Sequence, residues 1–401
     1  MTARSEVSGQ LSSVRVVVDG GPKLPTSGAS VDRFLADHEV PLVEDKSCTF
    51  LYRGEADDVR LAHRIVGLPD RLPMSRLPET DLWSVTLEVP EGSRIEYQFE
   101  VCRNGRVECS NDPLNPKLSY SPVGDSSVCF GPGYVAPDWT EPDPAAASGQ
   151  LTDLVVQSRA LGRDCPVTLY LPAGFRPDGG YPLLIVHDGG DFLRYAAAKT
   201  VLDNLIHRGQ TAETVVAFLH PRDRLIEYTD SAQHAEFVTR ELLPLLESEL
   251  PLASDRAARC LLGSSFGAIA SLSTARRYPD MYGSLVLLSG SFVSTCNGEP
   301  HRGGPAFDPV VEFVNDYRKH PAKVADRVFV SCGTFEPLIV RQRPMLDTFR
   351  SVGMDVRYVE AYDGHTWVNW RDRLCDALTW VDLQPFTAPA ESPEIDGSRS
   401  R

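Results

Sequence analysis

The sequence has 401 residues, enough for two domains, and its 42% hydrophobic and 24% charged residues are ordinary for a soluble globular protein. Its net charge of −15 argues against a nucleic-acid-binding surface and against docking on anionic lipid, because both need an excess of Lys and Arg to neutralise phosphate. No stretch approaches the roughly 18 apolar residues of a membrane span, and the N-terminus lacks the apolar region of a signal peptide. We therefore expect a cytoplasmic protein with no nucleic-acid partner and no membrane partner.

The first 140 residues have the pattern of a β-rich domain. One short amphipathic pattern, at 30–40, precedes segments rich in β-branched and aromatic residues that Gly, Pro and Asp turns separate. These segments are "CTFLYRG", "DVRLAHRIVG", "DLWSVTLEV" and "SRIEYQFEVCRNGRVECS". Their spacing predicts an antiparallel β-sandwich over residues 1–140.

A second domain follows a linker. The stretch 136–150 is rich in Pro, Ala and Ser without periodicity, and we assign 141–150 as the linker and 151–385 as the second domain. The polar, Pro- and Ser-rich residues 386–401 are expected to form a disordered tail.

In the second domain short apolar strands alternate with helical patterns. The strands are "PVTLYLP", "YPLLIVHDGG", "TVVAFLHP", "RCLLGSS", "SLVLLSGS", "RVFVSCG" and "DVRYVEAYDGH", and the helical patterns lie near 194–208, 233–249, 266–278, 341–352 and 369–383. Such alternation predicts an α/β domain, a mostly parallel, doubly wound sheet covered on both faces. Ligands bind such sheets at the carboxyl ends of the strands.

The candidate nucleophile is Ser265. The segment "LLGSSFG" fits the G-x-S-x-G pattern with Gly263, Ser265 and Gly267, directly after an apolar strand and before a helical run. A nucleophile elbow needs this context, because its serine has a strained backbone and strand and helix pass too closely for larger side chains. Ser264 is then the spacer; a purely structural strand-to-helix turn is the alternative.

A serine hydroxyl needs a base, and in this type of domain the base follows the serine and the acid along the chain. His365 lies in a Gly-containing loop after the last strand, whereas His301 and His320 lie in polar segments away from strand ends. We expect His365 to be the base. Its alternative is an ordinary surface histidine.

The third catalytic residue should be a carboxylate that orients the imidazole. Glu336 stands at the end of the preceding strand and is the best candidate; Asp347, in a helical pattern, and Asp363, in the loop of His365, are alternatives. All three could also be solvated surface charges.

The oxyanion hole needs two backbone N–H donors. Phe266, the residue after the nucleophile, should supply one, and Gly190 in the turn "HDGG" the other. The nine cysteines occur singly, without a C-x-x-C pair, and are expected to be reduced core thiols. No metal and no organic cofactor is expected.

Several motifs together resemble the esterase-D/enterochelin esterase family of α/β-hydrolases. "HDGGDF", "LLGSSFGAIASL", "YPDMYGSLVLLSGSF", "CGTFEP" and "GHTWVNW" follow the order of that family. "TFLYRG", "MSRLPETDLWSVTLEV" and "NDPLNPKLSYSP" resemble the N-terminal β-sandwich of enterochelin esterases, so the resemblance covers about residues 30 to 385. The hydrolase motifs alone leave esterase D, mycolyltransferases and carbohydrate esterases open, but the attached sandwich favours the siderophore esterases.

The resemblance implies an α/β-hydrolase domain preceded by an immunoglobulin-like (E-set) sandwich. It implies a serine esterase that cleaves the esters joining catechoyl-serine units of a trilactone siderophore and so releases iron in the cytoplasm. Its partner would be a small-molecule ester, in that family a ferric siderophore; the oligomeric state is not predicted. Ser265, His365 and Glu336 would be nucleophile, base and acid, although some relatives work as a Ser-His dyad.

The resemblance also implies a substrate-binding set. Arg224 and Glu227 match an Arg-x-x-Glu near the substrate, Trp370 matches a tryptophan five residues after the histidine, and Asp188 belongs to "HDGG". An exposed ion pair for the first two and a core tryptophan for the third are the alternatives.

Two departures from the family pattern leave the substrate open. Asp363-Gly364-His365-Thr366 stands where relatives have Gly-Gly-His-Asp, and Phe292-Val293 where they have an aromatic pair. A general carboxylesterase or acyltransferase acting on carbohydrate, lipid or xenobiotic esters is therefore an alternative, and a non-catalytic binding protein is a second one.

Overall fold

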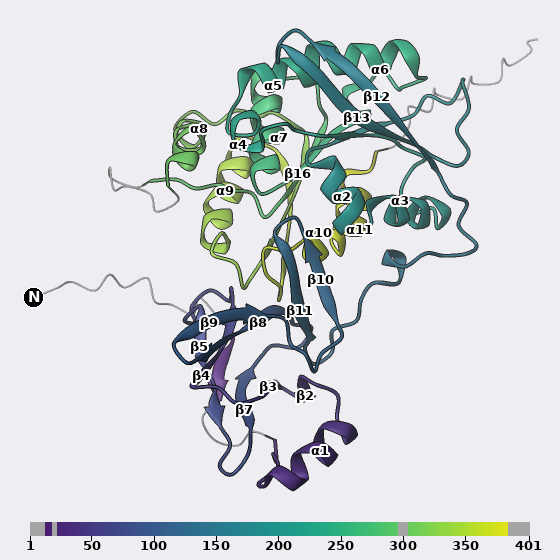
Figure 1. Ribbon diagram of the computed structural model, residues 1–401. Coiled ribbons are helices and arrows are strands. Elements are labelled where there is room, and N and C mark those ends of the chain that lie inside the picture. The colour runs from purple at the N-terminus through teal and green to yellow at the C-terminus, as the bar shows by residue number, and fades with distance from the viewer. Residues whose placement is uncertain (1–12, 18–21, 296–303, 384–401) are drawn as a thin grey trace, which may run out of the picture.

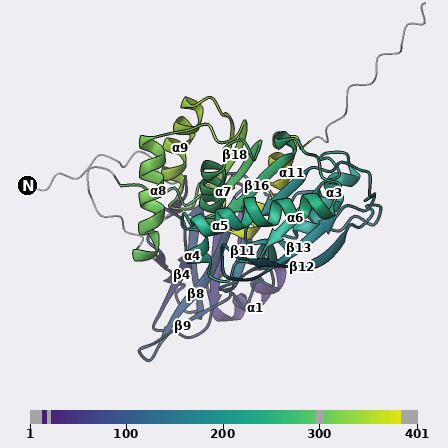
Figure 2. The same cartoon turned by 90° about the horizontal axis from the view of Figure 1, so that it is seen from above.

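The computed structural model describes residues 13–17, 22–295 and 304–383, and within them the chain forms two stacked parts (Figure 1). Seen from above, the first part lies beneath the second (Figure 2). The segment without helix or strand that joins them, 141–149, precedes the first strand of the second part. The predicted disordered tail, 386–401, lies outside the described residues.

Two antiparallel sheets make up the first part. The five-stranded sheet has the order β1-β7-β3-β2 with β6 paired to β7, and the six-stranded sheet has the order β10-β11-β8-β4-β5 with β9 paired to β8. A single helix, α1 (Gly28–Asp37), precedes most of these strands. The strands of the first sheet are β1 (Arg15–Val17), β2 (Leu42–Glu44), β3 (Ser47–Arg53), β6 (Ser75–Arg76) and β7 (Leu82–Glu88). Those of the second are β4 (Asp58–His63), β5 (Arg71–Pro73), β8 (Arg94–Arg103), β9 (Arg106–Ser110), β10 (Leu118–Ser121) and β11 (Gly124–Phe130).

The core of the first part lies between these sheets. Alternate residues of β8, among them Tyr97 and Phe99, are buried, as expected for strands with one face on a core. Phe50 of β3 meets Tyr97 edge-on, with ring centroids 4.7 Å apart, and so joins the two sheets. The predicted antiparallel β-sandwich is confirmed.

An eight-stranded sheet of order β12-β13-β15-β14-β16-β17-β18-β19 forms the second part. β12, β13 and β15 pair antiparallel, and every pairing from β15 to β19 is parallel. The strands are β12 (Gln150–Ser158), β13 (Arg163–Leu171), β14 (Leu183–Val186), β15 (Val215–Leu219), β16 (Arg259–Ser264), β17 (Ser284–Leu288), β18 (Arg327–Gly333) and β19 (Asp355–Ala361). This mostly parallel sheet confirms the predicted α/β-hydrolase class.

Helices cover both faces of this sheet. One face is packed by α5 (Ala232–Glu236), the π-helical η2 (Phe237–Leu242), α6 (Leu243–Glu249), α7 (Phe266–Arg277), α8 (Asp308–Lys319) and α9 (Ile339–Ser351). The other is packed by α2 (Gly189–Tyr195), α3 (Ala198–His207), α10 (Trp367–Arg371) and α11 (Leu374–Val381). The short helices α4 (Arg224–Glu227), η1 (Asp138–Thr140), η3 (Arg256–Ala258) and η4 (Pro305–Phe307) lie in connections. Because both faces are covered, β14, β15 and β17 are buried throughout.

The parallel strands bring the candidate residues to one edge of the sheet. Ser265, Ser289, Glu336 and His365 follow the carboxyl ends of β16, β17, β18 and β19, which are consecutive neighbours in the sheet. Carboxyl ends of parallel strands meet at the same edge, so four loops distant in sequence converge there.

The first part reaches the same region of the second. Strand β10 lies against α2, which begins within "HDGG", and against α10, which follows His365 (Figure 1). Within the described residues, no helix has the length and apolar character needed to span a membrane. Of the eight described cysteines six are buried, as expected, but Cys109 is exposed on β9; all eight are free thiols.

The close approach of β16 and α7 makes a stability prediction. A Cβ at Gly263 would lie 2.1 Å from the carbonyl oxygen of Gly267, a backbone atom that cannot rotate away. We expect Gly263→Ala to lower the free energy of unfolding by about 3 kcal/mol or more, since overpacking against a rigid neighbour forces the backbone to shift. Urea denaturation measures the change.

Gly28→Ala is the matched control. A Cβ at Gly28 would meet only the Glu79 carbonyl oxygen, at 3.8 Å, and Gly28 is the first residue of α1. This control should unfold like the wild type. A Gly263→Ala protein as stable as the control would contradict the tight strand-to-helix turn.

Candidate active site

Ser265 occupies the turn between β16 and α7 in a strained backbone conformation. Its φ of 56° and ψ of −117° fall in a region that non-glycine residues rarely adopt. The turn is fixed on both sides, because the Ser265 N–H donates to the Leu288 carbonyl at 2.9 Å and its own carbonyl accepts from Ala268 N–H at 3.2 Å. These contacts present the Ser265 side chain at the end of the strand, where a nucleophile elbow places it.

The loop after β17 joins Ser265 to the acid. The Ser291 N–H donates to the Ser265 carbonyl at 3.1 Å, and the hydroxyls of the two serines lie 3.2 Å apart. Two residues earlier, the Ser289 hydroxyl donates to Glu336 Oε1 at 2.6 Å. One Ser-Gly-Ser turn therefore contacts both the candidate nucleophile and the candidate acid.

Glu336 is a buried carboxylate whose oxygens both accept hydrogen bonds. It is 1% exposed; Oε1 accepts from Ser289 and, at 2.8 Å, from the Gly333 N–H, while Oε2 lies 2.5 Å from His365 Nδ1. Burial acts to raise its pKa, but the charge and hydrogen bond of His365, with those two donors, outweigh burial and lower the pKa. The carboxylate form is thus the one that this pocket stabilises.

His365 is oriented by Glu336 and by an aromatic ring. A carboxylate at Nδ1 requires that this nitrogen carry a proton, which leaves Nε2 as the basic nitrogen. Trp370 lies edge-on to the imidazole, with ring centroids 5.0 Å apart, and its indole N–H donates to Ser289 at 2.9 Å. Trp370 is 4% exposed, so it packs behind His365 and Ser289.

The two amides expected to form an oxyanion hole both lie in first turns of helices. Phe266 begins α7, and Gly190 is the second residue of α2, where backbone N–H groups have no partner within the helix. Space requires a glycine at position 189, because a Cβ there would lie 2.4 Å from Phe218.

Arg224 borders the elbow. Its Nε donates to both carboxylate oxygens of Asp188 at 2.9 Å, and its Nη2 donates to the Ser264 carbonyl at 3.3 Å. The guanidinium also lies 5.4 Å from the centre of the Phe266 ring. Burial raises the pKa of Asp188 to about 6 against the opposing charge of Arg224. Arg224 keeps a third of its side chain exposed and so presents a positive group beside Ser265.

Glu227 braces the loop that carries Arg224. It is 6% exposed and accepts from Arg163 at 2.6 Å and from the N–H groups of Arg222 and Asp223. Burial acts to raise its pKa, but these bonds and His234 lower it to about 2. Both Glu227 and Trp370 are thus buried. Glu227 supports the loop of Arg224, and Trp370 packs against His365.

Sequence reasoning did not find Ser289, Ser291, Arg163 or the buried His187 and His234, whose Nε2 atoms are 3.1 Å apart. The Ser-Gly-Ser after β17 was a usable signal, since it follows a buried strand in the same way as Glu336. His187 begins the motif "HDGG", but that motif was interpreted through its glycines and Asp188. Within the described residues no cluster of three or more His, Cys, Asp or Glu side chains could hold a metal ion.

The comparisons with known proteins agree with this geometry. The family model described as "Putative esterase" matches residues 158–381, more than half of the chain. The chain belongs to the putative esterase family. It is accordingly a carboxylic ester hydrolase, and a serine nucleophile is typical of this fold.

Individual relatives extend the similarity to both parts of the chain. The iron(III) enterobactin esterase of Escherichia coli K12 is 27% identical over 341 residues, 78% of this chain and 82% of that protein. An uncharacterised Bacillus subtilis protein, YjcH, is 25% identical over 36% of this chain, which spans 63% of that relative. The crystal structure of the Shigella flexneri enterobactin esterase in the presence of enterobactin superposes with a TM-score of 0.70 at 20% identity, covering 90% of this chain and 99% of that one. The resemblance to enterochelin esterases inferred from the motifs is confirmed.

Replacing the buried acid of this esterase tests whether the site is a triad. Glu336→Gln keeps the shape of the side chain but offers His365 an amide, which stabilises neither the required tautomer nor the imidazolium. We expect kcat for p-nitrophenyl butyrate to fall on the order of 10³-fold or more with KM little changed, as for other triads that lose the carboxylate.

The control is Glu360→Gln, a carboxylate on β19 that pairs with exposed Arg343. It should retain wild-type kinetics, and circular dichroism should show both variants folded. A Glu336→Gln enzyme within about tenfold of wild type would indicate a Ser-His dyad instead.

Proposed function

We propose that this chain is a serine esterase that hydrolyses the ester bonds of an enterochelin-like catecholate trilactone siderophore and releases iron in the cytoplasm. Ser265 is the nucleophile, His365 the general base and Glu336 the acid that orients it. The observation that carries the proposal is the hydrogen bond between buried Glu336 and His365, with the turn of Ser289 and Ser291 contacting both Glu336 and a strained serine. The enterobactin esterases, similar over most of their length, support the substrate class.

Acylation begins with proton transfer. His365 Nε2 takes the Ser265 hydroxyl proton as the oxygen attacks the ester carbonyl, and Glu336 stabilises the imidazolium that forms. The backbone N–H groups of Phe266 and Gly190 bind the carbonyl oxygen as it becomes negative. When the tetrahedral intermediate collapses, the bond to the serine oxygen of the neighbouring catechoyl-serine unit breaks, and His365 gives its proton to that oxygen, which leaves as a hydroxyl.

Deacylation repeats these steps with water. His365 removes a proton from the water as it attacks the acyl-enzyme, and Ser265 leaves with that proton restored. The net reaction consumes one water per ester cleaved and needs no metal or organic cofactor. A trilactone is thereby opened to linear and then shorter catechoyl-serine products.

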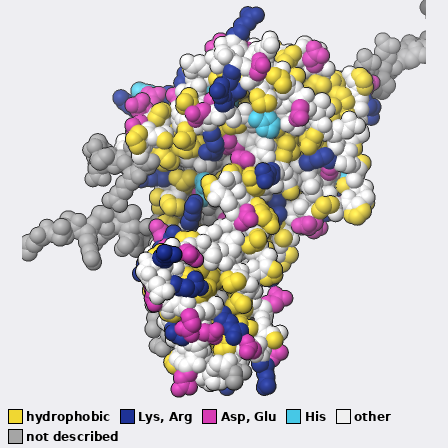
Figure 3. All heavy atoms as spheres, viewed as in Figure 1, with side chains coloured by type: hydrophobic (Ala, Val, Ile, Leu, Met, Phe, Trp, Pro, Cys, Tyr) yellow, Lys and Arg dark blue, Asp and Glu magenta, His cyan; other side chains and the backbone are white. Residues whose placement is uncertain are grey.

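Substrate recognition would depend on local positive charge. A ferric catecholate complex is anionic, while the chain has a net charge of −15. On the face shown in Figure 3, Lys and Arg side chains are interspersed with Asp and Glu, which favours no broad attraction. Arg224, held by Asp188 beside the elbow with a third of its side chain exposed, would bind a catecholate oxygen.

The test compares substrates and two adjacent serines. Ferric and iron-free trilactone and p-nitrophenyl butyrate would be incubated with wild type, Ser265→Ala and Ser264→Ala, with products followed by mass spectrometry. Ser264 is the matched control because it is fully buried, its hydroxyl has no hydrogen-bond partner and it lies in the same turn.

We expect wild type and Ser264→Ala to open the trilactone far faster than they cleave the generic ester, and Ser265→Ala to lose on the order of 10⁴-fold or more. An active Ser265→Ala enzyme would refute the nucleophile. Cleavage of the generic ester alone would leave a general carboxylesterase and refute the siderophore. No cleavage of any ester by a folded wild type would favour a binding protein.

A further inference from the structure

The residue before the candidate acid belongs to the core of the first part. Phe335 follows β18, yet it is 2% exposed and packs in the hydrophobic cluster between the two sheets of the sandwich. Its carbonyl accepts from the Val66 N–H of the first part at 2.7 Å, and its N–H donates to the Asp363 carbonyl at 3.1 Å. The Glu336 loop is thus anchored in the sandwich and tied to the His365 loop.

A buried arginine of the first part holds the His365 loop. Arg94, the first residue of β8, is 1% exposed, and its Nη1 donates to Asp363 Oδ1 and to the Thr366 hydroxyl, both at 3.2 Å. Its backbone N–H donates to the Tyr362 carbonyl at 2.9 Å. These partners lie on both sides of His365 along the chain.

Arg94 is itself held in the first part. Its Nη2 donates to Glu96 at 2.8 Å and to the Ser119 hydroxyl of β10 at 2.9 Å. A guanidinium with five donors in a rigid plane can span both parts in one geometry, which a lysine could not do. The hydrogen bonds of Arg94 therefore fix the His365 loop relative to the sandwich.

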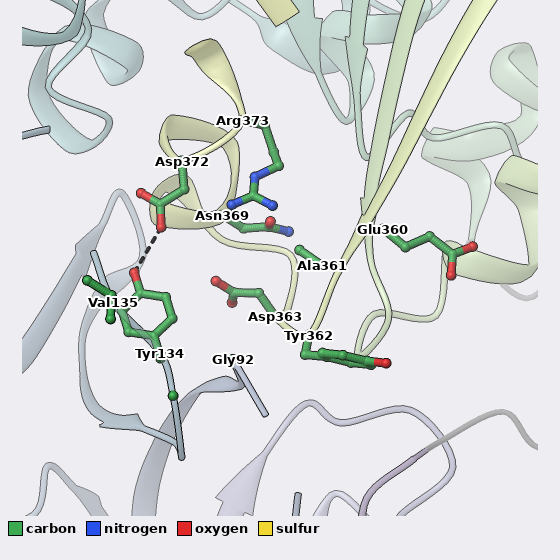
Figure 4. A pocket seen from close by; sticks show the side chains of 11 residues that line it. Gly92, Tyr134, Val135, Glu360, Ala361, Tyr362, Asp363, Asn369, Asp372 and Arg373 are labelled. Carbon is green, nitrogen blue, oxygen red and sulfur yellow. Dashed lines mark hydrogen bonds between the residues drawn. The ribbon is translucent and has the colours of Figure 1, made fainter. Parts of the chain in front are cut away.

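A cavity lies beside the contact between Arg94 and Asp363. About 330 Å³ of open space lies between the two parts, lined by Gly92 and Tyr134 of the first and by Tyr362, Asp363 and Asn369 of the second. In Figure 4 the Asp363 carboxylate lies between Tyr134 and Asn369 in this space. Apolar packing does not fill this side of the loop, so its position depends on ion pairs and hydrogen bonds.

We propose that the first part is a positioning element of the catalytic machinery, in which Phe335 fixes the Glu336 loop and Arg94 fixes the His365 loop. This inference rests on the roles proposed above for Glu336 and His365. Neither Phe335 nor Arg94 takes part in bond making; both act through the neighbouring acid and base. The site tolerates little error, because a displacement of about 1 Å can cost about 10²-fold in rate.

The charge of Asp363 explains why Arg94 matters. Burial raises the pKa of Asp363 to about 7, and Arg94 opposes that shift. Asp363 Oδ1 also accepts from the Gly364 N–H at 2.6 Å, directly before His365. Loss of Arg94 would remove the charge that lowers the pKa of Asp363 and so favour its neutral form, which accepts a weaker hydrogen bond from Gly364.

Point variants of the full chain test the proposal with p-nitrophenyl butyrate, whose cleavage does not depend on the siderophore. Arg94→Met removes the charge, and Tyr134→Phe is its control because it removes another bond between the two parts, from Tyr134 to Asp372 at 2.8 Å. Phe335→Leu loosens the anchor, and Phe99→Leu is its control in the same core.

We expect Arg94→Met and Phe335→Leu to lower kcat about 10- to 100-fold with KM nearly unchanged, and both controls to stay within about twofold of wild type. The downfield proton resonance of the His365 Nδ1–H should shift or broaden in the first two variants and persist in the controls. Should Arg94→Met fail to fold, the double variant Arg94→Met/Asp363→Asn, in which a neutral amide replaces the buried carboxyl, takes its place.

Wild-type kcat and an unchanged resonance in folded Arg94→Met or its substitute would overturn the positioning role. Equal losses in the variants and their controls would overturn it too, because they would indicate general weakening of the first part. An active Ser265→Ala enzyme in the same assay would instead refute the catalytic assignment itself.

Discussion

A buried carboxylate must have its charge balanced and its oxygens satisfied, and the site is organised around this requirement at Glu336. One oxygen accepts from Ser289 and Gly333, and the other contacts His365. Gly333 is the last residue of β18, and Ser289 and His365 lie just after β17 and β19, the two neighbours of β18 in the sheet. The proposed acid and base thus meet through the partners that one buried charge needs, and the Ser289–Ser291 turn connects them to the proposed nucleophile, Ser265.

The same requirement explains how the two parts of the chain are joined. The loops that follow β18 and β19 carry the proposed acid and base, and both loops contact the first part: Phe335 packs in its core, and Asp363 pairs with Arg94. The buried guanidinium of Arg94 thus balances the carboxylate of Asp363, two residues before His365. The sandwich is therefore more than an appended module. Its core contains Phe335, which precedes Glu336, and its buried Arg94 pairs with Asp363, two residues before His365.

The sequence could predict the parts of the site that depend on local pattern. Ser265, His365 and Glu336 each follow an apolar strand, and parallel strands bring such positions to one edge. Contacts between distant residues left no such pattern: Arg94 and Asp363 are 269 positions apart, and a buried arginine in a strand resembles an exposed one. Strand β12 was not predicted, because its exposed residues resemble a linker. Helix α8 was not predicted, because its pattern follows a polar segment. The single helix expected at 194–208 is interrupted at Ala197, which has a positive φ.

The most direct measurement is to trap the acyl-enzyme. Wild-type protein would be mixed with iron-free trilactone, quenched in acid within a single turnover and digested with trypsin, which releases Ser265 on the peptide 260–276. We predict an adduct with the mass of the whole trilactone on that peptide, because cleavage of one ester opens the ring and leaves all three catechoyl-serine units joined; fragmentation assigns it to Ser265. An adduct on another residue, or product formed with no adduct at any quench time, would contradict the assignment of Ser265 as the nucleophile.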